Sequence, residues 1–253
     1  VSHHHTCIHR ALKMALKSGL IFRNPADAVT PPHSQRPEIH TMNEDDISAF
    51  FEAAKETAYY VIFYMALFTG MRRSELLALR WSDLDLLLCQ ARVTRSLHRL
   101  LTGELVFRPT KTVKARRMVS LTPSTALLLQ EHKDNQEEQR AKVGMPFSED
   151  DLVFSNLKSQ PLLPDTISHA WTKLVNRAGL SGIRLHDARH THASLLLKQK
   201  VHPKIVQERL GHATISTTLD LYSHISPGLQ EAAAIGFDKM VLLRREKESL
   251  EKN

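Results

Sequence analysis

The stretch TAYYVIFYMALFTGMRRSELLAL, residues 57–79, decides how this chain folds. Its first part, Thr57 to Phe68, is apolar on nearly every helical face, which is typical of a helix buried in a core. Gly70 can adopt the left-handed conformation that ends a helix. A short helix from about Arg73 to Leu79 follows. The stretch therefore predicts a central buried helix with Arg72 at the start of the next one.

The region upstream of this stretch contains two further predicted helices. Apolar residues between Ser2 and Ser18 have the spacing of an amphipathic helix that ends at Gly19. Prolines are frequent from Asn24 to Pro37, which indicates a linker, so we place a domain boundary there, between residues 1–36 and 37–253. Thr41–Glu44 has capping-box spacing and predicts a helix that continues to about Ala54.

The region downstream changes to a strand pattern and then returns to helix. Apolar alternation between Leu86 and Leu121 predicts about three antiparallel strands, with a turn at Thr102-Gly103. Everything after Pro123 has a helical pattern, apart from a short strand expected at Leu152–Phe154. The fold class is therefore mainly α with a small antiparallel β-sheet, in the α+β group.

Composition narrows the function classes. The formal net charge is +7, with 34 Lys and Arg spread along the chain, which favours a polyanionic partner such as nucleic acid. Cys7 and Cys89 are far apart, which suggests neither a disulfide framework nor a thiolate zinc site and is compatible with a reducing cytoplasm. The longest apolar run, Tyr59 to Phe68, is about half of the ~20 residues that a membrane-spanning helix needs.

Three motifs contain residues suited to phosphate chemistry: TGMRRSELLAL (69–79), LHDARHTHAS (185–194) and LGHATISTTLDLY (210–222). The oxygens of a phosphodiester gain charge during displacement at phosphorus, so a site without metal needs rigid, forked cationic donors. Arg72 and Arg189 are suitable, and His186 lies three residues before Arg189, on the same helical face. Each arginine considered alone is more often a solvated surface residue.

The order and wording of these motifs resemble the signature boxes of the tyrosine recombinases, the integrases of phages and conjugative transposons. The resemblance extends from about Thr41 to His224, and more faintly to the segment before Pro31, which resembles the end of a helical core-binding domain. It implies that Arg72 and Arg189 hold the non-bridging oxygens and that Glu75 orients an active-site group. It further implies that His186 exchanges a proton with Tyr222, the nucleophile, that His212 donates a hydrogen bond to the phosphate, and that Lys111 protonates the leaving 5′ oxygen.

Simpler interpretations stay open for several of these residues. Glu75 could form a solvent-facing pair with Arg72, and His212 could belong to an ordinary helix cap. Lys114 competes with Lys111. The adjacent Arg73 is expected on another face, where a backbone phosphate could reach it. His186 and His190 have the spacing of a helical zinc pair, but no third ligand is evident, so we expect no metal or cofactor.

The resemblance also implies partners: double-stranded DNA, a dimer on one site and a tetramer of protomers in the synapse. The terminal segment from Gly236 either folds back on its own domain or docks into a neighbouring protomer, and the sequence leaves both open. Two other functions compete with recombination. One is a type IB topoisomerase, and the other is a DNA-binding regulator without catalysis.

Overall fold

The computed structural model describes residues 2–30, 40–110, 116–156 and 158–219, together with 235, 237 and 238. The chain divides into two compact units, Val1–Ile39 and His40–Asn253. Within the described residues, every helix is too short or too polar to cross a membrane.

The first unit is one helix with a short turn packed on it. Helix α1 (Ser2–Lys17) confirms the predicted amphipathic helix. Part of the expected linker is not extended: Asn24 caps the 3-10 helix η1 (Pro25–Ala28), and its side-chain amide donates to the carbonyl of His9 at 3.3 Å. His9 also lies 2.6 Å from Asp27, so the turn is held against α1 by polar contacts.

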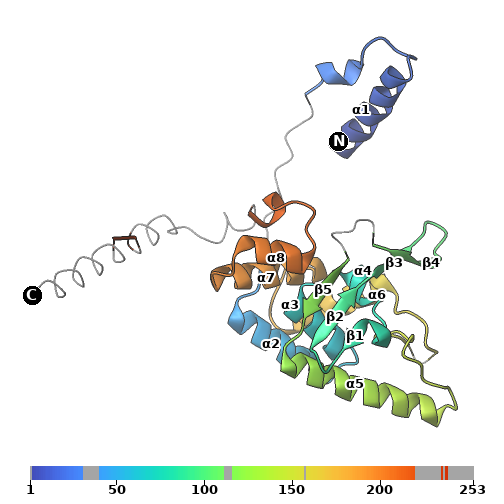
Figure 1. The fold of residues 1–253 in the computed structure, drawn as a ribbon, viewed down its shortest axis with the longest axis vertical. Helices are drawn as coiled ribbons and strands as arrows, with labels where there is room; N and C mark the ends of the chain where they lie inside the picture. The colour runs from blue at the N-terminus through green and yellow to red at the C-terminus, as the bar shows by residue number, and fades with distance from the viewer. Residues whose placement is uncertain are drawn as a thin grey trace, which may run out of the picture. The chain divides into compact units, whose positions relative to one another are not determined.

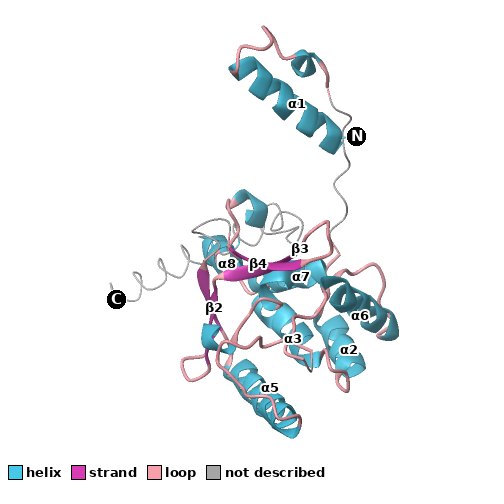
Figure 2. Cartoon of the chain, turned by 90° about the vertical axis from the view of Figure 1, so that its right-hand side faces the viewer, coloured by secondary structure: helices cyan, strands magenta, loops and turns pink. Residues whose placement is uncertain are grey.

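Helix α3 (Tyr60–Thr69) runs through the middle of the second unit (Figures 1 and 2). It packs against α2 (Glu44–Ala54), α5 (Pro123–Lys142) and α7 (Leu185–Lys198). It ends at Gly70, whose φ of 64° is left-handed, as the sequence predicts. It begins three residues later than Thr57. The cap of α2 also differs from the prediction: Asn43, not Thr41, accepts a hydrogen bond from the backbone N–H of Asp46.

Aromatic rings fill the core beside α3. The ring of Phe50 lies 4.4 Å from that of Trp171 on α6 (Pro164–Arg177), and Phe63 lies 5.2 Å from the same indole. The indole N–H of Trp171 donates to the carbonyl of Ile183 at 3.1 Å, which leaves no unpaired polar group in this cluster. The core therefore fixes α2, α3 and α6 as one packed layer.

The strand region forms two small sheets, where the sequence predicts one. Strands β1 (Leu84–Asp85), β2 (Gln90–Val93) and β5 (Arg117–Ser120) are antiparallel in the order β1-β2-β5, and β3 (Arg95–Arg99) pairs with β4 (Leu105–Pro109). The division falls at Thr94, whose carbonyl accepts from the N–H of Thr110 and whose hydroxyl reaches Asp83. The expected strand at Leu152–Phe154 is wrong, because only Leu152 forms a bridge, to Arg80.

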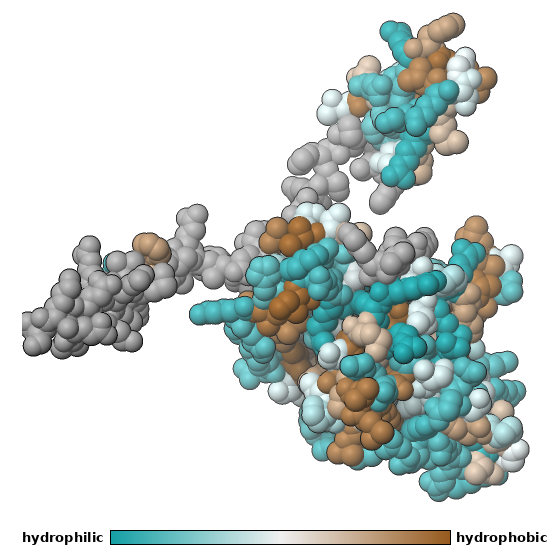
Figure 3. Space-filling model, in the orientation of Figure 1, coloured by the Kyte–Doolittle hydropathy of each residue, from teal (hydrophilic) through white to brown (hydrophobic). Residues whose placement is uncertain are grey.

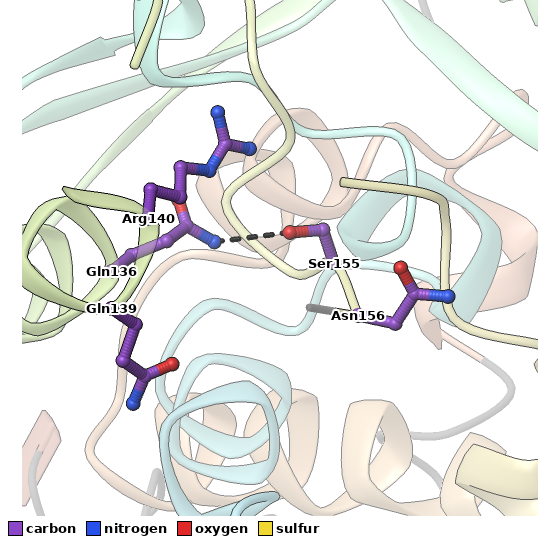
Figure 4. A pocket seen from close by; sticks show the side chains of 5 residues that line it. All are labelled: Gln136, Gln139, Arg140, Ser155 and Asn156. Carbon is purple, nitrogen blue, oxygen red and sulfur yellow. Dashed lines mark hydrogen bonds between the residues drawn. The ribbon is translucent and has the colours of Figure 1, made fainter. Parts of the chain in front are cut away.

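Helix α5 lies at the edge of the unit and is fixed by side chains that reach the loop after it. Gln136 accepts from the indole N–H of Trp81 at 2.7 Å and donates to the hydroxyl of Ser155 at 3.1 Å (Figure 4). Arg140, which is buried, pairs with Asp151. The remaining described elements are α4 (Arg73–Leu76), η2 (Trp81–Asp83) and α8 (Pro203–Leu210). Figure 3 shows that the visible face of this unit carries mostly hydrophilic side chains with separate apolar patches between them.

Candidate active site

The C-terminus of α3 is the first of two helix ends that build the site. Its free backbone carbonyls would be left without partners at the end of the helix. Side chains from α7 and α8 donate to them: His192 Nδ1 to Leu67 at 2.8 Å, Arg209 Nη2 to Phe68 at 3.1 Å, and Arg189 Nη1 to Gly70 at 2.7 Å. We call this group of carbonyls the α3 end.

The C-terminus of α8 is the second, and it also terminates in a left-handed glycine, Gly211, with φ of 66°. Three arginines donate to its last carbonyls: Arg117 Nε to Arg209 at 2.7 Å, Arg189 Nη2 to Leu210 at 2.5 Å, and Arg72 Nη2 to Gly211 at 3.4 Å. Cations are stabilised here because the carbonyl end of a helix carries partial negative charge. We call this group the α8 end.

Arg189 joins the two ends, because its guanidinium donates to Gly70 on one and to Leu210 on the other. It is only 3% exposed. Burial, and then the charge of Arg72, lower the pKa of Arg189 to about 9, which still leaves the group protonated at neutral pH. A planar fork held at two points has one orientation, as recognition of a phosphate requires.

Arg72 and Arg189 line one groove of about 490 Å³, together with His186. The two guanidinium groups therefore face a common space, although they are 117 positions apart in the sequence (189 − 72). Arg73 lines the same groove, so the expectation that it occupies another face is wrong. It donates to the carbonyl of Pro164 at 3.0 Å and to the hydroxyl of Ser168, which draws it across to the start of α6.

Glu75 lies beneath Arg72 and is 4% exposed, which excludes a solvent-facing pair. Its carboxylate accepts from the backbone N–H and Nη1 of Arg72 at 2.9 and 2.8 Å. It also accepts from Arg117 Nη1 and Nη2 at 3.1 and 2.9 Å. Burial by itself would raise the pKa of Glu75, but hydrogen bonds and charge from Arg117, and then from Arg72, hold it below its ordinary value. The carboxylate is therefore ionised between two arginines.

Arg117 also belongs to the site, although none of the three sequence motifs contains it. It follows another arginine at the start of β5, which is typical of a solvated pair. The alternation of the strand contains the missing signal: Val119 and Leu121 are buried, so Arg117, two positions earlier, points inward as well.

His186 lines the groove, and its ring makes an edge-to-face contact with that of His190, with centroids 5.0 Å apart. Burial lowers the pKa of His186, and His190 and Arg189 lower it further. The imidazole of His186 is therefore neutral at neutral pH and able to accept a proton. Among the described residues, no group of three or more His, Cys, Asp or Glu side chains is placed to hold a metal ion.

His212 follows Gly211, so the glycine that ends α8 also places the histidine. Its Nδ1 lies 2.9 Å from the hydroxyl of Thr218, which is fully buried. Burial, followed by the charges of Arg189 and Arg72, lowers the pKa of His212 to about 3. A neutral ring bonded at Nδ1 has Nε2 left for a ligand. His212 therefore both follows the glycine cap of α8 and has a free nitrogen for a ligand, so the two interpretations of this residue are compatible.

The structure brings together five of the predicted site residues: Arg72, Glu75, His186, Arg189 and His212. The other predicted residues, Lys111 with its competitor Lys114 and the nucleophile Tyr222, lie outside the described residues. So does the terminal segment from Gly236, apart from residues 237 and 238.

Comparison with known proteins gives consistent results. The family model described as "Phage integrase family" matches residues 40–228. The ICEBs1 integrase of Bacillus subtilis (strain 168) is 31% identical over 93% of this chain and 64% of its own length. A XerC-like tyrosine recombinase of Caldanaerobacter subterraneus is 30% identical over 84% of this chain and 59% of its own length. The chain thus spans about three fifths of the length of these relatives.

Solved structures share the fold. The integrase of the Tn1549 transposon, in complex with transposon right end DNA, aligns with a TM-score of 0.76 and 20% identity, over 92% of this chain and 76% of that one. The XerA recombinase aligns with a TM-score of 0.61 and 26% identity, over 90% of this chain and 73% of that one. A lambda integrase dimer bound to a core site aligns at 0.57 and 20% identity, covering 86% and 57%.

Proposed function

Because this chain belongs to the phage integrase family of tyrosine recombinases, we propose that it cuts and rejoins DNA at specific sites through a covalent bond to Tyr222. The observation that supports this most strongly is the pair of guanidinium groups, Arg72 and Arg189, held by helix carbonyls over one groove. Such a site suits a phosphodiester, because preorganised donors stabilise charge that develops on its oxygens.

The first step is an exchange of bonds at phosphorus. The phenolic oxygen of Tyr222 forms a bond to the scissile phosphorus while the bond to the 5′ oxygen breaks, which leaves a 3′-phosphotyrosine and a free 5′ hydroxyl. A phenol with a pKa near 10 needs a base to react at neutral pH. His186 accepts the phenolic proton, and Lys111 supplies the proton of the new 5′ hydroxyl.

The remaining side chains stabilise the pentavalent state. Arg72 and Arg189 pair with the non-bridging oxygens, and the neutral His212 donates an N–H to one of them. Glu75 keeps Arg72 oriented. In the second half of the reaction a 5′ hydroxyl of the partner strand attacks the phosphotyrosine and releases Tyr222. The energy of the broken bond is kept in the enzyme linkage, so no cofactor enters the scheme.

The proposed partner is double-stranded DNA in the bacterial cytoplasm, with a mobile element as the source of the sites. The related integrases of Tn1549 and lambda were solved with transposon end DNA and with a core site, the latter as a dimer. We propose the same partner here, with a dimer on each site, a tetramer in the synapse, and the terminal helix as the candidate link between protomers. Residues 37–253 would form the catalytic domain and 1–36 the end of a core-binding domain.

Covalent trapping tests this function. A pool of nicked duplexes with randomised sequence around the nick is incubated with the chain, and adducts stable in SDS are recovered and sequenced. The wild type should give adducts at a defined sequence, with DNA mapped to Tyr222 by peptide analysis, and Tyr222→Phe should give none. DNA binding without any adduct would instead indicate a regulator. Relaxation of a supercoiled plasmid carrying the recovered site, without exchange between plasmids, would indicate a topoisomerase.

A further inference from the structure

Arg117 makes a set of contacts that connects three elements of the site. Its side chain is 6% exposed, starts on β5, donates Nε to the carbonyl of Arg209 at 2.7 Å and places both terminal nitrogens on Glu75. Glu75 in turn holds Arg72 at the start of α4. One guanidinium therefore ties the strand, the α8 end and the support of Arg72 together.

The packing around this guanidinium is tight. A Cβ added to Gly211 would lie 3.1 Å from both Cδ and Nη1 of Arg117, so the α8 end rests directly on the arginine side chain. The α8 end also provides Leu210, which orients Arg189, and precedes His212. A shift of Arg117 would thus move Glu75 and the α8 end together, and with them both Arg72 and Arg189.

We infer that Arg117 is a positioning residue, which sets the separation of Arg72 and Arg189 by fixing Glu75 against the α8 end. This inference rests on the proposed function. Arg117 acts through the other two arginines, whose purpose is to balance the negative charge of the phosphate. The contribution of Arg117 should therefore depend on that charge, whereas a purely structural contribution should not.

A matched control exists elsewhere in the same unit. Arg140 on α5 also has a side chain that is 6% exposed, and it also pairs with a carboxylate, that of Asp151. It borders a small cavity with Gln136, Gln139, Ser155 and Asn156 (Figure 4), and none of these residues contributes to the site described above. Substituting Arg140 disturbs the ion pair of an equally buried arginine, whose partner Asp151 is 22% exposed, without touching Glu75 or the α8 end.

The experiment compares Arg117→Lys with Arg140→Lys on two nicked duplexes of the sequence recovered by trapping. One duplex has the natural scissile phosphate, and the other has a methylphosphonate, in which a methyl group replaces one non-bridging oxygen and removes the negative charge. The rate of strand cleavage is measured in the full 253-residue chain, below the thermal midpoint of every variant. For each variant we take the factor by which the rate falls below that of the wild type on the charged duplex and divide it by the same factor on the neutral duplex. A smaller folded fraction lowers both rates equally, so it does not affect this ratio.

For Arg117→Lys we expect cleavage of the charged duplex to slow by about tenfold or more, since small misplacements of catalytic groups are costly, and cleavage of the neutral duplex by less than about twofold. Arg140→Lys should slow both equally. Equal losses on both duplexes for Arg117→Lys would overturn the inference alone. Absence of any wild-type adduct on the charged duplex would overturn the proposed function, and this inference with it.

Discussion

The α3 end and the α8 end are built alike and used differently. Each terminates in a left-handed glycine, Gly70 or Gly211, and each has its last carbonyls bonded by side chains. At the α3 end the space is closed: a Cβ on Gly70 would lie 2.5 Å from Leu210 and 2.9 Å from His192. At the α8 end the three atoms nearest to a Cβ on Gly211 all belong to the side chain of Arg117, at 3.1 to 3.4 Å, and His212 follows directly.

The difference shows how the arginines of a polar site can be held rigidly and still be accessible to a ligand. The α3 end is an anchor, because both ring nitrogens of His192 and all three guanidinium nitrogens of Arg209 are engaged in hydrogen bonds within the protein. The α8 end accepts hydrogen bonds from Arg72 and Arg189, which line the groove, and His212 follows it directly. Arg189 bonds to both ends, so the fixed position of the α3 end also fixes the guanidinium that lines the groove. This division predicts that substitutions at the α3 end reduce stability more than rate, and that those at the α8 end do the reverse.

The largest effect is expected for Arg189→Lys, which removes the fork that joins the ends. One ammonium group cannot reach the carbonyls of Gly70 and Leu210 and also present a planar pair of donors to the phosphate. The rate of adduct formation should fall by about 10²- to 10³-fold, the range for loss of one preorganised donor. Single-turnover cleavage of the nicked duplex measures it.

Arg209→Lys is the matched variant for this test. Arg209 bonds through its side chain to Phe68 and His192 at the α3 end and to Ser120 on β5. Its rate should fall by less than about tenfold, since the groove side chains keep their supports. If the two substitutions reduce the rate by the same factor, the division between anchor and reactive side does not exist.

The two glycines offer a comparison of stability. Alanine at either position carries the strain of a left-handed residue, about 1–2 kcal/mol. Gly70→Ala must also displace Leu210 and His192, and overpacking in a core adds about 1–3 kcal/mol. Gly70→Ala should therefore lower the free energy of unfolding by about 2–5 kcal/mol, and Gly211→Ala by only about 1–2 kcal/mol.

Urea unfolding of both alanine variants measures these losses of stability. For the cleavage rate we expect the opposite order of the two variants. Gly211→Ala pushes on Arg117 and should slow cleavage more than Gly70→Ala does, once both are compared at temperatures where they are fully folded. Equal losses of stability would mean that the α3 end is able to relax, and that its closure is not a rigid feature of the fold.

Much of this arrangement could be predicted from the sequence, since local patterns determine it. The apolar run before Gly70 predicts α3 and its end, and the motifs around Arg72 and Arg189 predict that both arginines serve one site. Local patterns do not predict contacts between residues that are far apart in the sequence. Nothing near Arg117 in the sequence indicates that it meets Glu75, 42 positions away, so this arginine is absent from the predicted site.

The strand region shows the same limit. Alternation between Ala91 and Ser96 predicts one strand, but the bonds of Thr94 to Thr110 and Asp83 turn the chain, so that β2 and β3 join different sheets. Likewise, capping-box spacing fits Thr41 as well as Asn43, and only the fold determines that Asn43 begins α2. Spacing identifies candidates, and tertiary contacts choose among them.

The last prediction concerns the pH dependence of stability and tests the α3 end alone. His192 donates from Nδ1 to Leu67 and accepts at Nε2 from Arg209, so its folded form is neutral. Burial, and then the charge of Arg209, lower the pKa of His192 to about 4. In the unfolded chain it should be about 6.5. Between these values the unfolded state binds a proton that the folded state does not, so stability falls as the pH decreases from about 6.5 and the loss is complete below about 4.

His192→Gln measures this contribution, because glutamine can donate and accept but does not titrate. Between pH 7 and pH 5 the wild type should lose about 2 kcal/mol more of its unfolding free energy than the variant does, as determined by urea titration at each pH. His212, with a pKa of about 3, is present in both proteins, so its contribution cancels. Parallel pH profiles for the two proteins would mean that His192 has the same pKa in the folded and unfolded states, and that Arg209 does not donate to a neutral His192 in the fold.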